Sequence, residues 1–215
     1  MTLAAAEAYG VEQMIAELEE AVRAGIYRPK PVRWVEIPEP DGSKRPLGIP
    51  TAKGRVCQQA AKIVLEPIFE ADFLRCSSAF RPKWPATDAM EKIRVGFIEG
   101  KCFVSEADIR DFFNRLGFGL ILGCLRERVS DRKVLRLVGT ILEAGAPDGE
   151  VLPHPGEGAP QGGPPSPLLA DAVLHRRDRA WQLRHRRLGP ERLTGTIDFG
   201  RSARAAGSKV GACRR

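Results

Sequence analysis

The sequence lacks the features that would mark a membrane protein or a metal-stapled domain. No run of about 18 apolar residues occurs in its 215 residues, so we expect no membrane-spanning helix. The N-terminus shows no basic segment followed by a long apolar core, so we expect no signal peptide and a cytoplasmic location. Its five cysteines and three histidines show no zinc-ligand spacing, and we expect reduced thiols.

Charge is distributed unevenly along the chain, which has a net charge of +7. The segment from Ala172 to Arg215 holds twelve Lys and Arg against three acids, so the remainder carries −2. Such a segment can attract phosphate backbones through counterion release, although a solvated basic tail explains the composition equally simply. Aromatic residues are scarce there, and no apolar period follows Gly189. We therefore expect residues 190–215 to form a degenerate, disordered basic tail.

Hydrophobic periodicity predicts helices mixed with short hairpin strands. The apolar residues from Val11 to Val22 recur at helical spacing, and Gly25 is a plausible stop. Further helices are expected over 56–64, 86–97, 120–125, 134–142 and 168–183, and short strands over 32–37, 47–49 and 102–104. Strand–helix alternation is rare, which favours an α+β fold over a doubly wound sheet.

Two of these expected helices show a distinct apolar face. In the first, Val56, Ala60, Ile63 and Val64 share one side, and Pro67 limits the helix. In the helix over 86–97, the apolar positions are Ala89, Met90, Ile93 and Phe97. A helix with one apolar stripe normally turns it toward a core.

Three blocks carry the candidate chemistry. The first is Ser43-Lys44-Arg45-Pro46-Leu47-Gly48-Ile49-Pro50, which follows a turn signal. The second runs from Phe103 to Phe113, where Asp108 ends an apolar strand-like stretch. The third is Gly158-Ala159-Pro160-Gln161-Gly162-Gly163-Pro164-Pro165-Ser166-Pro167, whose glycines allow close backbone approach to a ligand. In this order they closely resemble the reverse transcriptase domain of group II intron-encoded proteins, the reverse transcriptase/maturases, from about Gly25 to about His175.

This resemblance implies the fingers and part of the palm of a right-hand polymerase. In such enzymes Lys44 and Arg45 would grip the triphosphate, Phe113 would exclude a ribose 2′-hydroxyl, and Gln161 would contact the nucleotide. A further block, Ser78-Ala79-Phe80-Arg81-Pro82, resembles one in which Arg81 supports the RNA template path or the fold. Apart from the resemblance, these residues are ordinary turn, core or loop residues.

The resemblance also implies a metal site for phosphoryl transfer. Two magnesium ions would be held by carboxylates, with Asp108 and the carbonyl of Ile109 among the ligands. From spacing alone, Asp108 is better interpreted as a strand-end or helix-capping aspartate. The family carries Tyr-Ala-Asp-Asp on a later hairpin, whereas this chain reads Thr194-Gly-Thr-Ile-Asp198-Phe-Gly200. Asp198 can therefore supply one carboxylate, and its neighbour is missing.

These observations lead to two hypotheses of function. The first is an RNA-directed DNA polymerase that uses an RNA template or intron RNA, a DNA primer and deoxynucleotides, truncated and impaired, without a thumb. The alternative is a non-catalytic RNA-binding remnant of an intron-encoded maturase, and the lone Asp198 favours it. We expect an N-terminal helical extension over 1–30, the fingers and partial palm over 31–189, and the tail beyond. Asp108, Phe113 and Gln161 should line one cleft faced by the Lys44–Arg45 hairpin.

Overall fold

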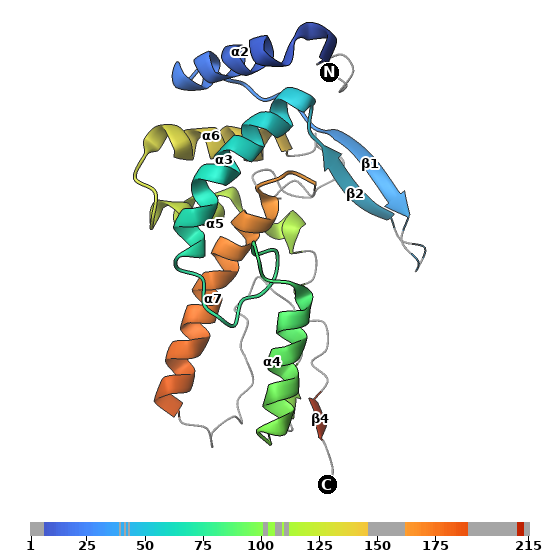
Figure 1. Cartoon of the computed structure of the whole chain (residues 1–215), viewed down its shortest axis with the longest axis vertical. Helices are drawn as coiled ribbons and strands as arrows, with labels where there is room; N and C mark the ends of the chain where they lie inside the picture. Colours follow the sequence, from blue (N-terminus) through green and yellow to red (C-terminus); the bar gives the residue numbers. More distant parts are fainter. Residues whose placement is uncertain are drawn as a thin grey trace. The chain divides into compact units, whose positions relative to one another are not determined.

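The structure is a computed structural model that describes residues 7–38, 40, 42, 44–100, 103–105, 109, 112–145, 162–188 and 210–212 (Figure 1). The chain forms two compact units. The first comprises Met1–Phe73 and Phe113–Arg176, and the second comprises Leu74–Phe112 and Arg177–Arg215. Most expected helices are present, and the strands form two small two-stranded sheets, which agrees with the α+β expectation.

The first unit begins with α2, Val11–Arg23, as the periodicity predicted. Met14 and Leu18, one turn apart, form its buried side and pack against Tyr27. Gly25 ends the helix in a left-handed conformation with φ of 72°, and its N–H bonds to the carbonyl of Val22. Glycine adopts this conformation without the steric cost that a side chain brings.

Helix α3, Ala52–Glu70, follows a capped start at Thr51, whose hydroxyl accepts a hydrogen bond from the Gly54 N–H. The apolar face expected from the sequence is not the buried one. Ile63 is 61% exposed, and the buried face instead contains Leu65. Its other buried members are Gly54, Cys57, Gln58, Ala61 and Phe69. The helix also continues through Pro67, because a proline in the last turn removes only one hydrogen bond near the end.

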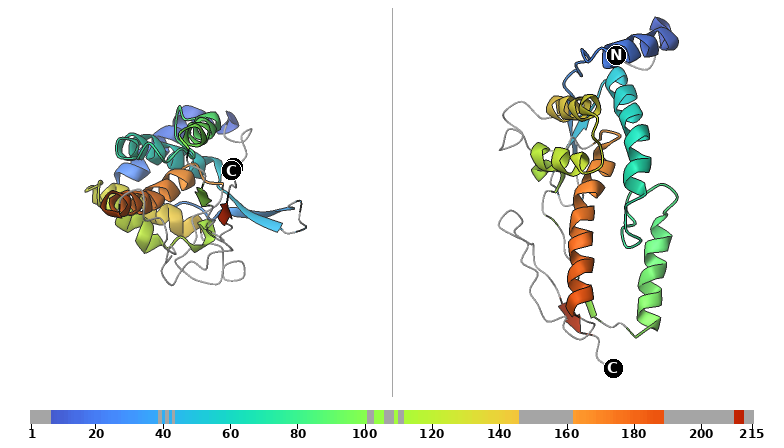
Figure 2. Two further views of the ribbon diagram at one scale, coloured as in Figure 1. Left: turned by 90° about the horizontal axis from the view of Figure 1, so that it is seen from below. Right: turned by 90° about the vertical axis from the view of Figure 1, so that its left-hand side faces the viewer.

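The core of the first unit is built by α3, α5 (Phe118–Arg126), α6 (Arg132–Gly145) and the start of α7 (Ser166–Leu188). Its least accessible side chains are Leu65, Ile121, Leu125, Leu142 and Leu169. Figure 2 shows α5 and α6 side by side against the N-terminal part of α7. An ion pair between Arg128 and Asp72 connects the ends of α5 and α3, with Nη2 2.6 Å from Oδ1.

A hairpin projects from this core (Figures 1 and 2). Its strands are β1, Arg33–Pro38, and β2, Lys44–Ile49, paired antiparallel with Val35 opposite Leu47. Lys44 and Arg45 therefore lie inside the second strand, which begins three residues earlier than expected. At the base of the hairpin, the Val32 N–H donates to the carbonyl of Ala144 at 3.2 Å, which fixes β1 to the end of α6.

The second unit contains α4, Ala86–Ile98, and the strands β3, Phe103–Ser105, and β4, Val210–Ala212. Helix α4 has the expected extent, but none of its residues is buried, so its apolar stripe does not face a core within the described residues. Strand β4 pairs antiparallel with β3 and was not expected from the sequence. The rest of the predicted tail, 190–209 and 213–215, lies outside the described residues.

Candidate nucleotide-binding site

The hairpin presents its cationic end to solvent. The Lys44 ammonium donates to Glu36 Oε2 across the two strands at 2.6 Å, and both side chains are exposed. The hydrogen bond that Lys44 donates to Glu36 raises the pKa of Lys44, so the ammonium stays charged at neutral pH. An exposed pair of this kind contributes little stability, so Lys44 can exchange Glu36 for another anion. The backbone of Arg45 pairs with Ile37, while its side chain lies outside the described residues.

The glycine loop of the third block packs directly on β2. Gly162 has φ of 107°, a conformation that residues with a side chain rarely adopt. A Cβ atom there would lie 2.9 Å from the carbonyl oxygen of Gly48 and 3.0 Å from Leu47 Cδ1. The backbone of the loop thus reaches the strand that carries Lys44 and Arg45, across more than a hundred residues of sequence. Only glycine satisfies both the conformation and the contact.

The next glycine lies against α3. A Cβ at Gly163 would be 3.0 Å from Gln58 Oε1 and 3.2 Å from Ser166 Oγ. Gln58 is 3% exposed, and within the described residues its Oε1 has no hydrogen-bond partner. An unsatisfied buried acceptor is unusual and costs about 1–3 kcal/mol. Sequence reasoning did not select Gln58, because the importance of this residue depends on where the glycine loop returns to α3.

The remaining expected site residues are only partly described. Phe113 opens the short 3₁₀ helix Phe113–Arg115 in the first unit and is half-buried. Ile109 is half-buried too and belongs to the second unit. Asp108, Gln161 and Asp198 lie outside the described residues, so the expected common cleft and metal site stay predictions. Among the residues that the structure describes, no group of His, Cys, Asp and Glu could hold a metal ion.

Arg81 has a defined place in the second unit. Its side chain is buried, and Nη1 donates to the carbonyls of Leu74 and Ser77 at 2.9 and 2.8 Å. Its guanidinium lies 4.5 Å from the centre of the Trp84 ring, and the Lys92 ammonium lies 4.3 Å from the same ring. Arg81 thus holds the loop in shape. A contact between Arg81 and the RNA template stays a prediction.

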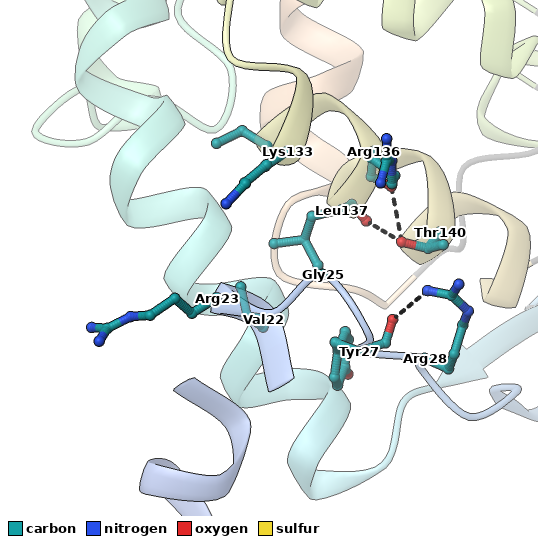
Figure 3. A pocket seen from close by; sticks show the side chains of 10 residues that line it. Val22, Arg23, Gly25, Tyr27, Arg28, Lys133, Arg136, Leu137 and Thr140 are labelled. Carbon is teal, nitrogen blue, oxygen red and sulfur yellow. Dashed lines mark hydrogen bonds between the residues drawn. The ribbon is translucent and has the colours of Figure 1, made fainter. Parts of the chain in front are cut away.

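The first unit also contains a pocket that sequence reasoning missed (Figure 3). It has a volume of about 230 Å³ and lies between the end of α2, the following loop and α6. Its lining residues are Val22, Arg23, Gly25, Tyr27, Arg28, Lys133, Val134, Arg136, Leu137 and Thr140. Burial raises the pKa of Tyr27, and the Cys57 thiol beside its hydroxyl raises it further.

Comparison with solved structures gives the class of fold. A chain of the "Partial Cas6-RT-Cas1--Cas2 complex" matches 80% of this chain with a TM-score of 0.50 and 23% identity, and the match covers 30% of that chain. This likeness concerns the fold alone, and it is consistent with a reverse-transcriptase-like arrangement.

Sequence comparison gives the family. No family model matches the sequence. Group II intron-encoded protein LtrA of Lactococcus lactis subsp. cremoris is 34% identical over 187 residues, which is 85% of this chain and 31% of that protein. Protein YkfC of Escherichia coli (strain K12) is 34% identical over 167 residues, 75% of this chain and 44% of that protein. Nuclear intron maturase 1, mitochondrial, of Arabidopsis thaliana is 31% identical over 94 residues.

The chain therefore belongs to the family of group II intron-encoded reverse transcriptases and maturases, as its three blocks indicated. It spans less than half of the length of these curated relatives. None of the helices in the part of the chain that the structure describes is long and apolar enough to span a membrane.

Proposed function

We propose that this chain carries the nucleotide-binding and RNA-binding fingers of an RNA-directed DNA polymerase of the group II intron type. The observation that supports it most is the contact between the glycine loop and β2. A Cβ atom placed on Gly162 would lie 2.9 Å from the Gly48 carbonyl oxygen and 3.0 Å from Leu47 Cδ1, so two of the three blocks pack closely against each other. A chain in which each block was only a local turn would need no such contact.

The chemistry of the hairpin suits a triphosphate. Lysine offers a compact charge and arginine a planar fork with two parallel N–H donors, and both bind phosphate oxygens well. Lys44 already holds an anion, the Glu36 carboxylate, in an exposed position where a phosphate could replace it. Gln161 directly precedes the packed Gly162, so a fixed Gly162 would restrict where the glutamine can reach. Phe113 would then act as the wall beside the deoxyribose.

Polymerisation also requires metal ions, which in this family stabilise the attacking and leaving oxygens. The expected ligands, Asp108, the Ile109 carbonyl and Asp198, include two residues outside the described part of the chain, so the proposal contains no step through the metal. The alternative function, a non-catalytic RNA-binding remnant, is favoured by one sequence feature. Only a single carboxylate, Asp198, stands where the family has two in succession.

Two measurements on the full chain test the proposal. Equilibrium binding of a fluorescent deoxynucleoside triphosphate should weaken at least tenfold in the K44A/R45A double variant, because two charge-assisted contacts are lost. The variant R75Q/R126Q removes two exposed cations outside the hairpin and should bind normally. Equal binding by wild type and K44A/R45A would contradict a triphosphate site at the hairpin.

Primer extension on an RNA template with magnesium separates the polymerase from the remnant. We expect no measurable extension by this chain. Extension that disappears in Asp108→Ala would establish catalysis and overturn the alternative. Absence of extension together with hairpin-dependent nucleotide binding would favour the remnant.

A further inference from the structure

The pocket between the end of α2 and α6 has a strongly one-sided charge. Four of its ten lining residues are cations, contributed by two segments that face each other: Arg23 and Arg28 on one side, Lys133 and Arg136 on α6 (Figure 3). None of the lining residues is acidic. All of them belong to the first unit, so the pocket does not depend on the placement of the second.

These cations are available to a ligand. Lys133 and Arg136 stand one turn apart on α6, and among the described residues neither side chain forms an ion pair or hydrogen bond. Among the described residues, Arg28 donates only to the neighbouring carbonyl of Tyr27. Arg23 pairs with Glu19, but the two side chains are 79% and 62% exposed, so this pair is weak and easily exchanged.

Between the cations the pocket is lined by apolar side chains, one of which packs against the buried side of α2. Val22, Val134 and Leu137 line it together with Tyr27, which is anchored by packing on Met14 and Leu18. The volume of about 230 Å³ is below the roughly 300–1,000 Å³ of typical sites for drug-sized ligands. It suits one small planar ring, with an anionic group held at the rim.

We propose that this pocket binds one nucleotide of single-stranded RNA, with the base in the apolar cavity and the flanking phosphates on Lys133, Arg136 and Arg28. The proposal rests on the proposed function for its ligand class and adds a contact site outside the hairpin. A polyanion with apolar planar bases matches both properties of the pocket, whereas an acidic peptide matches the charge alone. Phosphate contacts give affinity that depends on salt, and an enclosed base adds a contribution to the binding free energy that does not depend on salt.

The first arm of the test removes charge. Binding of a fluorescent single-stranded RNA oligonucleotide to the full chain is measured by anisotropy from roughly 50 to 200 mM salt. The K133Q/R136Q variant should bind on the order of tenfold more weakly at low salt, as expected for two exposed charge-assisted contacts. Its log–log salt slope should become shallower by about 1.4, at about 0.7 per lost phosphate contact on a single strand. The matched control, R75Q/R126Q, removes the same charge elsewhere and should keep the wild-type slope.

The second arm fills the cavity and leaves the charge unchanged. Val134→Phe should weaken RNA binding several-fold with an unchanged salt slope, because it displaces the base and retains the cations. An abasic RNA of equal length should bind wild type and Val134→Phe alike. Circular dichroism and thermal unfolding verify that each variant is folded, and Val134→Ile serves as a second variant if the phenylalanine unfolds the protein.

The outcomes distinguish this inference from the proposed function. If K133Q/R136Q and Val134→Phe both bind RNA as wild type does, the pocket is not an RNA site, even if triphosphate binding at the hairpin is demonstrated. If the pocket variants bind RNA more weakly but the wild type binds no triphosphate, the RNA site in the pocket is supported and the polymerase assignment is refuted. A poly-glutamate peptide that competes with RNA for the pocket, with abasic and normal RNA bound equally, would also overturn base binding.

Discussion

Replacing Gly162 by alanine tests the contact on which the nucleotide site depends. The structure gives this substitution two separate costs. At φ of 107° a side chain is in an unfavourable backbone region, which costs about 1–2 kcal/mol. The new Cβ would also lie 2.9 Å from the Gly48 carbonyl and 3.0 Å from Leu47 Cδ1, and overpacking of this kind costs about 1–3 kcal/mol. We therefore expect a free energy of unfolding lower by about 2–5 kcal/mol.

Gly25→Ala supplies the matched control. Gly25 also has a positive φ, 72°, but nothing lies within 4 Å of its Cβ position, so only the backbone cost applies. The difference between the two variants isolates the steric contact with β2 and should be about 1–3 kcal/mol. Each kcal/mol corresponds to about 2–4 °C in Tm for a protein of this size. Urea unfolding followed by tryptophan fluorescence is a suitable assay, because Trp34 lies beside Gly48.

A third variant identifies the partner of the clash. The double variant Leu47→Ala/Gly162→Ala removes the clash with the leucine. Its loss in free energy of unfolding should therefore be smaller than the sum of the losses in the two single variants. The Gly48 carbonyl still opposes the new methyl group, so recovery should be incomplete. Equal destabilisation by Gly162→Ala and Gly25→Ala would refute the packing of the glycine loop on the hairpin.

Other predictions follow from single residues. Gln58→Leu removes a buried acceptor that has no partner among the described residues, and should leave the free energy of unfolding unchanged or raise it by about 1 kcal/mol. A clear loss in urea unfolding would show that the amide is satisfied. Phe80 is 70% exposed at φ of 53°, so Phe80→Gly should raise stability by about 1 kcal/mol, and a lower unfolding midpoint would contradict the strain. Burial raises the pKa of Cys57, while a hydrogen bond from Tyr27 lowers it in part. A thiol reagent near pH 8 should therefore modify the exposed Cys76 before the buried Cys57, which mass spectrometry of partial reactions can show.

The helices were predictable from the sequence because their periods are local, but the choice of buried face was not. Helix α3 contains two apolar stripes, one through Ile63 and Val64 and the other through Leu65 and Phe69. Both have helical spacing, and the sequence offers no way to decide between them. The choice is made by contact with α6, which lies far away in the sequence.

The same limit explains which candidate site residues could be selected from the sequence. Lys44 and the glycine loop stood out because their blocks match a known order of motifs. The pocket did not stand out in the sequence, because Arg28 and Lys133 are more than a hundred residues apart and belong to unrelated patterns. The Arg81–Trp84–Lys92 arrangement was missed for a different reason. A lone tryptophan in a proline-rich loop has no pattern of its own, although its spacing of three residues from Arg81 is a weak local signal.

The division of the chain into two units bears directly on how the proposed function can be tested. The hairpin and the glycine loop both belong to the first unit, and the contact that joins them uses only residues of that unit. The sequence ranges that contain Asp108 and Asp198 belong to the second. The proposed triphosphate site therefore does not depend for its shape on the residues expected to hold the metal, and loss of a carboxylate need not disturb it. For this reason nucleotide binding and primer extension are independent measurements. A chain that binds the nucleotide but does not extend a primer would still retain the nucleotide-binding part of a polymerase site.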